Sequence, residues 1–368
     1  MRFPEFSGEW KMCTIGELIT KVGSGVTPRG GEAVYKTEGH PFVRSQNVGL
    51  GNLLLDDIAF IDEETHLRQK NTELQFNDVL LNITGASIGR SALVDKQIVG
   101  GNVNQHVCII RTKENLVPSF ICSFLLSNYG QRQIDSFQAG GNRQGLNFEQ
   151  IKSIKITIPS KDEQIKIAKL LRAIDERIAT QNKIIDKLQS LIKGIAQNVA
   201  RNNKPNIRLS ECLECSSSTL QESDVCKNGT YPVYGANGIV GYLDNYNTEK
   251  EAVYIIKDGS GVGTVSYVTG KCSATGTLNT LQAKEGYSLQ YLYYMLKVFN
   301  FEPYKTGMAI PHIYFKDYGK AKIFCPSYTE QLKYARLLSA IDNKLSAEQS
   351  ILTDLSLQKQ YLLRQMFI

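Results

Sequence analysis

The chain has 368 residues and a formal net charge of +6, with 42% hydrophobic and 21% charged residues. This length predicts about two domains, because a domain usually holds roughly 100 to 200 residues. The opening MRFPEFSGEWK has no apolar stretch of the signal-peptide type, and no segment approaches the roughly 18 apolar residues of a membrane span, so we expect a cytoplasmic protein without a membrane partner.

Residues 1–158 are predicted to form a first domain that is rich in β-structure. Short apolar runs such as DVLLNI and HVCIIR are separated by glycine, asparagine and aspartate turns, which is the pattern of a turn-rich sheet. A helical stretch, PSFICSFLLSNYGQRQI, follows near the end of the domain. This combination indicates an α+β fold.

The next segment, 159–203, predicts a long helix that packs on another helix. Counting three and four residues alternately from Leu171 gives the a/d seam of a coiled coil with one polar interruption, and no proline breaks it. The seam consists of Leu171, Ile174, Ile178, Gln181, Ile185, Leu188, Ile192, Ile195 and Val199.

A second domain and a second helix follow in the same order. The polar segment ARNNKPNIRLS predicts a boundary, and 204–325 again shows short apolar runs, such as AVYIIK and GTVSYV, with the helical stretch SLQYLYYMLKVFN near the end. Residues 326–368 predict the second long helix. Its seam consists of Leu338, Ile341, Leu345, Glu348, Leu352, Leu355, Lys359, Leu362 and Met366.

The two helical segments are copies of one passage. From Pro159 and from Pro326 the sequences agree at 11 of 20 positions, and the match extends backwards, where AGGNRQGLNFEQIKSIKITIPS aligns with TGMAIPHIYFKDYGKAKIFCPS and pairs Phe148 with Phe315. Farther upstream only short echoes remain, GASIG with GSGVG and TIGELI with RLSECL. The chain is therefore an internal repeat in which the helices are similar and the domains differ.

Chain order predicts how the helices pair. The first helix leads away from domain one, so a second helix that packs on it must run back antiparallel. Helices of roughly 35 residues are about 50 Å long, which exceeds a DNA turn of roughly 34 Å. Two related, inverted domains at the ends of such a rod would suit two separate sites on a duplex.

No catalytic or metal-binding motif is recognisable. The nucleotide loop G-x-x-x-x-G-K-[ST] and the Asn-Pro-Pro-aromatic motif of adenine methyltransferases do not occur in the sequence. Cys212 and Cys215 have zinc-like spacing, yet no second close pair completes a set of four ligands, so we expect both to be small apolar residues in a helical turn. The four histidines form no metal or triad pattern. The sequence predicts a non-catalytic protein without a bound metal.

Several passages closely resemble the specificity subunits of type I restriction-modification enzymes. They are the doubled PS..EQ.K.A.LL.AID, the opening W....IGELI...GSGVTP, the GGNRQGLNF loop and YPVYGANGIVGYLDNY. The resemblance covers essentially the whole chain, and the helical passages are its specific part. The second loop, GMAIPHIYF, lacks the Gly-Asn-Arg-Gln sequence of the first.

The resemblance implies a function for each part. The two variable domains would be target recognition domains, each reading one half of a bipartite asymmetric site in double-stranded DNA. The helices would set the spacing and dock two methyltransferase subunits and, where they exist, two restriction subunits. The chain itself would bind no cofactor, whereas S-adenosylmethionine would be bound by the methyltransferase and ATP with Mg by the restriction subunit.

Candidate DNA contacts are hydrogen-bonding side chains on predicted loops. Arginine can bond guanine and Asn or Gln can bond adenine, each through two hydrogen bonds, although each residue taken singly also fits an ordinary surface loop. In domain one the candidates are Arg44, Gln46, Asn47, Asn142, Arg143 and Gln144. In domain two they are Tyr234, Asn237, Lys257, Asn279 and His312.

Candidate partner contacts are polar residues that both helical copies share beside the seam. A surface present twice should bind two copies of one partner. The alternative is helix capping and solvated surface, because a glutamate near a helix start offsets its free amides. The residues are Glu163, Gln164 and Asp175 in the first copy and Glu330, Gln331 and Asp342 in the second.

Two other classes of protein remain open at this point. A coiled-coil scaffold could hold two protein-binding domains, and it would show no salt-dependent DNA binding. An RNA-binding adaptor would prefer single strands and stack aromatic side chains on bases, which the 18 tyrosines would allow. Neither alternative explains why the helices are nearly duplicated while the domains diverge.

Overall fold

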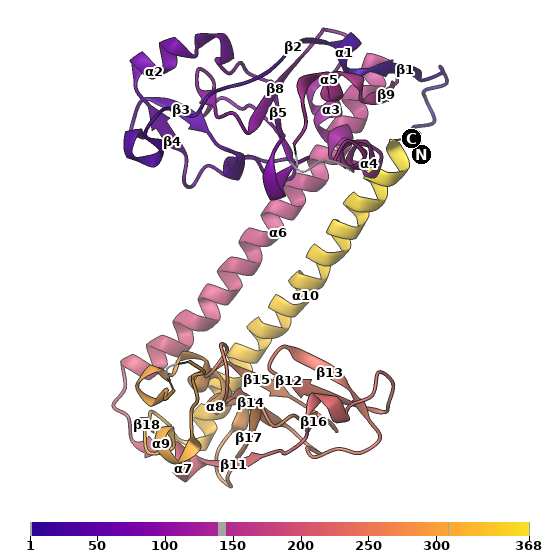
Figure 1. The fold of residues 1–368 in the computed structure, drawn as a ribbon. Helices are drawn as coiled ribbons and strands as arrows, with labels where there is room; N and C mark the ends of the chain where they lie inside the picture. The colour runs from indigo at the N-terminus through magenta and orange to yellow at the C-terminus, as the bar shows by residue number, and fades with distance from the viewer. Residues whose placement is uncertain (1, 139–144, 308, 368) are drawn as a thin grey trace. The chain divides into compact units, whose positions relative to one another are not determined.

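The computed structural model describes residues 2–138, 145–307 and 309–367 and divides into two compact units. Unit 1 consists of Met1–Gln181 with Ile351–Ile368, and unit 2 consists of Asn182–Ser350. Figure 1 shows that each unit contains β-sheets, short helices and parts of two long helices. No helix in the described ranges is both long and apolar enough to cross a membrane.

Unit 1 contains three small sheets. The four-stranded sheet has the order β2 (Ile19–Ser24), β8 (Val107–Thr112), β5 (Val79–Asn82), β6 (Ser91–Leu93), and all its pairs are antiparallel. The three-stranded sheet has the order β4 (Ala59–Ile61), β3 (His40–Val43), β7 (Asn102–Val103). A two-stranded sheet pairs β1 (Lys11–Thr14) with β9 (Lys155–Ile158).

Unit 2 repeats this topology strand for strand. Its four-stranded sheet has the order β11 (Leu213–Ser217), β17 (Leu278–Ala283), β14 (Ala252–Ile256), β15 (Val265–Val268). Its three-stranded sheet has the order β13 (Gly238–Leu243), β12 (Tyr231–Gly235), β16 (Ser273–Ala274), and its short sheet pairs β10 (Ile207–Arg208) with β18 (Lys322–Ile323). The structural repeat therefore extends through both domains, although the sequence match thins upstream of the helices.

Short helices also recur between the strands. Unit 1 contains α1 (Ile15–Leu18), α2 (Glu63–Arg68), α3 (Pro118–Leu125), α4 (Asn128–Ser136), α5 (Phe148–Ser153) and the 3-10 turns 31–34, 45–47, 70–72 and 85–87. Unit 2 contains α7 (Leu209–Cys212), α8 (Leu289–Val298), α9 (Phe315–Tyr318) and the 3-10 turns 222–224 and 302–304. The aligned residues Phe148 and Phe315 each begin their helix, α5 and α9, as the repeat predicts.

The long helices are α6 (Lys161–Arg201) and α10 (Tyr328–Met366), which lie within the predicted segments 159–203 and 326–368 and have 41 and 39 residues. Every residue of the two predicted seams is buried or half-buried, including the polar Gln181 and Glu348. In unit 1 the end of α10 packs on the start of α6, where Lys359 Nζ lies 2.6 Å from Asp175 Oδ1. The prediction of an antiparallel coiled coil is confirmed.

The last described residues of the chain pack into the hydrophobic core of unit 1. Phe367 packs against Phe120 and Phe124 of α3, with ring centroids 5.2 and 5.9 Å apart, and is 4% exposed. Trp10 contacts the same Phe120 ring at 6.5 Å. In Figure 1 the yellow end of α10 accordingly lies beside the magenta segments of unit 1. The hydrophobic core of this unit thus depends on both ends of the sequence.

The first turn of each long helix is bonded to the domain that precedes it by a buried glutamine. Gln164 Oε1 accepts from the amide of Val117 (2.9 Å), the residue before α3, and Gln331 Oε1 accepts from the amide of Ser288 (2.9 Å), the residue before α8. The Nε2 groups donate to the carbonyls of Pro159 (3.1 Å) and Pro326 (2.9 Å). Both glutamines are 1% exposed, so this shared residue pair has a structural role in each unit.

Replacing Phe367 with alanine should destabilise unit 1. The change removes a ring from between two others and leaves a cavity, which typically costs about 3 to 5 kcal/mol. We expect a lower unfolding midpoint in thermal or urea denaturation of the full chain. Leu357→Ala is the matched control, because Leu357 lies on the same helix and is 58% exposed. Equal midpoints for the two variants would contradict the assigned packing.

Replacing Gln331 with alanine should destabilise unit 2. The buried amide of Ser288 would lose its acceptor, and an unsatisfied buried donor costs roughly 1 to 3 kcal/mol. Urea denaturation should show this loss for Gln331→Ala and for the equivalent Gln164→Ala. Gln358→Ala serves as control, because Gln358 is exposed on α10. A midpoint for Gln331→Ala as high as that of the control would show that the glutamine does not anchor the helix.

Candidate nucleic-acid interface

A glycine loop follows the central strand of each four-stranded sheet. After β5 the chain reads Thr84-Gly85, and after β14 it reads Asp258-Gly259, with φ of +73° and +97° at the two glycines. Such positive φ favours glycine, because a Cβ atom would be strained there. The echoing passages GASIG and GSGVG therefore form the same turn in the two units.

Backbone hydrogen bonds hold the two loops in the same way. In unit 1 the amide of Ile83 donates to the carbonyl of His106 (3.0 Å), and Leu146 donates to Ile83 (2.9 Å). In unit 2 the amide of Lys257 donates to Thr277 (3.0 Å), and Ile313 donates to Lys257 (2.9 Å). Each glycine loop thus lies beside the residues that lead into α5 or α9, at Leu146 in unit 1 and at Ile313 in unit 2.

In unit 1 the glycine loop borders a pocket of about 420 Å³. Its lining combines backbone of the loop with hydroxyl, amide, imidazole and guanidinium groups, and no carboxylate is among the described lining residues. Gln46 and Arg90 are exposed. The side chains that line it are Ser45, Gln46, Thr84, Ser87, Arg90 and His106. Such a surface can donate hydrogen bonds to base edges or to phosphate oxygens.

Of the first three candidate residues, only Gln46 lines this pocket. Arg44 donates to the carbonyl of Asp57 (2.6 Å), and its side chain is 14% exposed. Asn47 is fully buried and its Nδ2 donates to Leu54 O (2.8 Å) and Asp57 Oδ1 (2.9 Å). Arg44 and Asn47 therefore shape the loop from which Gln46 projects. The other candidates of this domain, Asn142, Arg143 and Gln144, lie outside the described residues.

Sequence reasoning missed three polar residues at this loop: Arg90, Gln105 and His106. His106 Nδ1 lies 2.5 Å from the hydroxyl of Thr84, and its Nε2 lies 2.9 Å from Gln105 Nε2. Gln105 Oε1 accepts from the amide of Thr27 (3.0 Å). The available signal was the passage NQHVCIIR, which places Gln105 and His106 at the start of a predicted strand.

In unit 2 the candidates separate into exposed and buried groups. Asn237 is exposed in the two-residue turn between β12 and β13, and His312 is half-exposed beside the glycine loop, with Nδ1 2.6 Å from Asp258 Oδ1. Lys257 is half-buried. Tyr234 packs on Tyr254 (centroids 5.7 Å apart), and burial raises its pKa.

Asn279 and the two closely spaced cysteines have structural positions. Asn279 is 4% exposed and accepts from Ser217 Oγ at 2.7 Å. Cys212 ends α7, whereas Cys215 lies on β11, so the expectation that both lie in a helical turn is wrong for Cys215, because α7 is only one turn long. Burial raises the pKa of Cys212 to about 12 and that of Cys215 to about 11, which keeps both thiols protonated. The described residues contain no cluster that could hold a metal.

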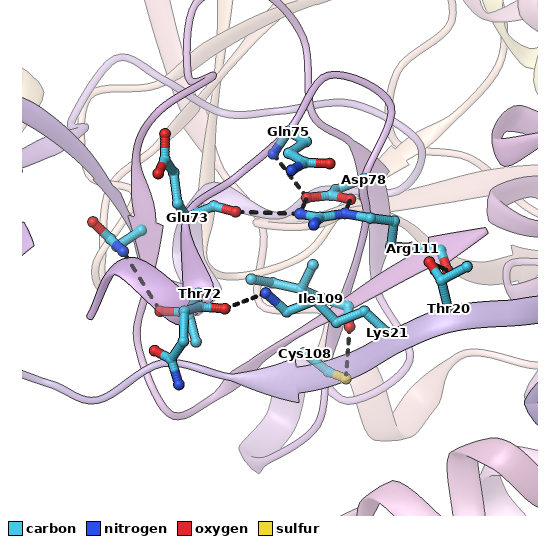
Figure 2. Close-up of polar contacts among 11 residues, drawn as sticks. Thr20, Lys21, Thr72, Glu73, Gln75, Asp78, Cys108, Ile109 and Arg111 are labelled. Carbon is cyan, nitrogen blue, oxygen red and sulfur yellow. Dashed lines mark hydrogen bonds and ion pairs between the residues drawn. The ribbon is translucent and has the colours of Figure 1, made fainter. Parts of the chain in front are cut away.

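A charged cluster occupies the opposite end of the same sheet in unit 1 (Figure 2). Arg111 Nε and a terminal nitrogen each lie 2.7 Å from the oxygens of Asp78, which is almost fully buried. Lys21 is the cross-strand partner of Arg111, and its pKa is lowered by burial and then by that guanidinium. The register of β5 and β8 puts this cluster at the end away from His106. The cluster therefore stabilises the sheet and is not part of the pocket.

Most candidate partner contacts make hydrogen bonds or ion pairs within their own unit. Glu163 forms a bidentate ion pair with Arg2, at 2.8 Å for both bonds, and is buried, like Gln164 and Gln331. Asp342 accepts from the Tyr294 hydroxyl at 3.2 Å, and Asp175 pairs with Lys359. Glu330 is exposed and accepts from Ser327 Oγ at 2.8 Å, which is a capping contact.

Comparison with known proteins gives one consistent family. The family model described as the type I restriction modification DNA specificity domain matches residues 7–190 and again 205–356. A protein of Mycoplasma genitalium provisionally named a type I specificity subunit is 25% identical over 320 residues, which cover 79% of this chain and 81% of that protein. The EcoKI specificity subunit of Escherichia coli K12 is 22% identical over 52% of this chain and 41% of its own length.

The fold agrees with these sequence matches. The crystal structure of the type I restriction-modification S subunit from M. genitalium superposes with a TM-score of 0.68 at 18% identity and covers 100% of this chain and 97% of that one. Two family domains in tandem, each ending in a long helix, account for the repeat seen in sequence and topology. The chain belongs to the family of type I restriction-modification DNA specificity subunits.

Proposed function

We propose that this chain is the non-catalytic, sequence-specific DNA-recognition subunit of a type I restriction-modification complex. Each β-rich domain reads one half of a bipartite asymmetric site. The observation that carries the proposal is the strand-for-strand repetition of one topology, with a glycine loop at the same place and different side chains around it. Two domains that share a backbone topology but differ in their exposed polar side chains suit the recognition of two different half-sites.

The DNA contacts of domain one are assigned to the polar pocket and the loop beside it. Gln46 and Arg90 offer exposed donors that can bond adenine, guanine or phosphate oxygens. Asn142, Arg143 and Gln144, which lie outside the described residues, remain candidates from the sequence. Arg44 and Asn47 are proposed to act through the loop that they shape.

In domain two the exposed turn and the glycine loop supply the contacts. Asn237 and His312 offer hydrogen-bonding groups to base edges, and Lys257 offers a positive charge to phosphate. Tyr234 offers a partly exposed ring beside Asn237. Asn279 is buried, so we assign it to the support of β11 and β17 rather than to direct contact.

The paired helices are proposed to set the distance between half-sites and to dock two methyltransferase subunits. The presence of one apolar seam in each helix supports a shared role as a spacer. Exposed Glu330 and the half-exposed Asp175 and Asp342 are the polar candidates for docking, whereas buried Glu163, Gln164 and Gln331 support the helices from inside. S-adenosylmethionine belongs to the methyltransferase, and ATP with Mg to the restriction subunit.

Exchanging residues 1–158 for those of a related subunit should change one half of the recognised motif only. Residues 1–158 contain the strands β1 to β9 of unit 1, and the sequence that forms unit 2 is untouched. The measurement is methylome sequencing of cells that express the hybrid with its methyltransferase subunits, with the unexchanged chain as control. A change in both halves, or in neither, would contradict modular recognition.

The purified chain should be inactive alone and should form a complex with two methyltransferase subunits that methylates adenine. Two similar helical surfaces in one chain should bind two copies of one partner. Mass measurement of the reconstituted complex, with methyl transfer assayed in parallel, checks this. Full activity in a stable one-to-one complex, or methylation by the isolated chain, would refute the proposed assembly.

A further inference from the structure

In both units a histidine side chain contacts the residue that precedes the first glycine of the glycine loop. His106 contacts Thr84 in unit 1, and His312 contacts Asp258 in unit 2. We propose that His106 and His312 are positioning residues, each of which fixes the glycine loop of its own unit for the reading of its own half-site. The inference rests on the proposed function. It adds that His106 and His312 determine how accurately the glycine loops are placed for DNA recognition. Neither histidine needs to touch DNA for this role.

In unit 1 the contact is part of a chain of hydrogen bonds with a defined direction. Gln105 Oε1 accepts from the amide and the hydroxyl of Thr27, so its Nε2 must face His106 and donate to the ring (2.9 Å). His106 Nε2 is then an acceptor and Nδ1 carries the proton, which it donates to the Thr84 hydroxyl at 2.5 Å. One imidazole thus connects the loop at Thr27 to the glycine loop.

In unit 2 the corresponding contact is a hydrogen bond between an imidazole and a carboxylate. His312 Nδ1 lies 2.6 Å from Asp258 Oδ1, with both side chains about one-third exposed. The amide of Gly259 donates to Pro311 O at 3.0 Å, and Thr306 and His312 exchange backbone bonds of 2.9 and 2.7 Å. The pair therefore joins the glycine loop to the segment before α9.

Thr84 and Asp258 occupy equivalent positions. The turn that each begins is closed by the same backbone bond, from Gly89 to Asn82 (3.0 Å) and from Gly263 to Ile256 (2.9 Å). The histidines, however, come from different segments, the turn before β8 in one unit and the loop before α9 in the other. Histidines from two different segments thus make the same kind of contact with the glycine loop, in domains whose side chains have otherwise diverged. We therefore assign the contact a role in both units.

The contact matters because backbone bonds close the turn, whereas the side chain of Thr84 is oriented by its bond to His106. Gly85 and Ala86 are exposed, and they lie between Thr84 and Ser87, which both line the pocket with Arg90. A binding site discriminates only when its groups are held within roughly 0.5 Å of the required geometry. Without His106 the side chain of Thr84 loses this orientation at the edge of the pocket, so base discrimination should weaken in domain one alone.

The test uses the full chain in complex with its methyltransferase subunits. His106→Ala should lower discrimination at the half-site of domain one by about tenfold or more, the value of one lost positioning hydrogen bond, and leave the other half unchanged. His312→Ala should do the reverse. The readouts are competition binding with duplexes altered in one half, and the methylated motif in cells.

Milder variants separate positioning from folding. Thr84→Val keeps the side-chain shape and removes the hydroxyl, so it should reproduce His106→Ala with an unchanged thermal midpoint. In unit 2, Asp258→Ala should lose discrimination, whereas Asp258→Thr, which installs the residue found at position 84, should restore it. The double variant His312→Ala with Asp258→Ala should be no worse than either single change.

A matched control is His40→Ala, because His40 also lies in unit 1 but away from the glycine loop. Its ring stacks on that of His66, with the two centroids 3.8 Å apart. Its discrimination should equal that of the wild type. Folded His106, Thr84 and His312 variants with wild-type discrimination would overturn the positioning role and leave the proposed function standing. A wild-type complex without preference for any duplex would overturn both.

Discussion

The apolar seam shared by α6 and α10 is the constraint on which the rest of the structure depends. A long helix with one apolar stripe is not stable alone in water, because it must bury that stripe against a partner. Here the partner is a second copy of the same passage, which must return antiparallel. Unit 1 is consequently completed by residues 351–367, and its core includes Leu362, Met366 and Phe367 from the end of the sequence.

The two domains show how one frame can support different surfaces. Strand order, the glycine turns and the backbone bonds around them are the same, since these depend on main-chain groups and on a few buried side chains. The polar side chains at the loops differ, from Thr84 and His106 in one unit to Asp258 and His312 in the other. Buried strand residues differ as well, for example Leu80 of β5 against Tyr254 of β14, so what the two units share is chiefly the main-chain frame.

Residues present in both copies have structural roles more often than the repeat alone suggested. Gln164 and Gln331 are buried and hold equivalent helix starts, and Glu163 is paired with Arg2. A buried donor without an acceptor is costly, which explains why these residues recur wherever the helix meets its domain. Repetition in a sequence therefore marks folding requirements as well as shared partners.

The sequence by itself determined the repeat, the two β-rich domains, the long helices, the buried seams and the family. The family followed from the resemblance of whole passages, whereas the other features follow from periodicity and spacing, which are local properties of the chain. Only the tertiary structure decided which loop residues face outwards, because exposure depends on distant partners: Asp57 accepts hydrogen bonds from Arg44, Gln46 and Asn47, and of these three only Gln46 is exposed and lines the pocket. It also brought Thr27, Thr84 and His106 together from three separate segments, a contact that no local pattern encodes.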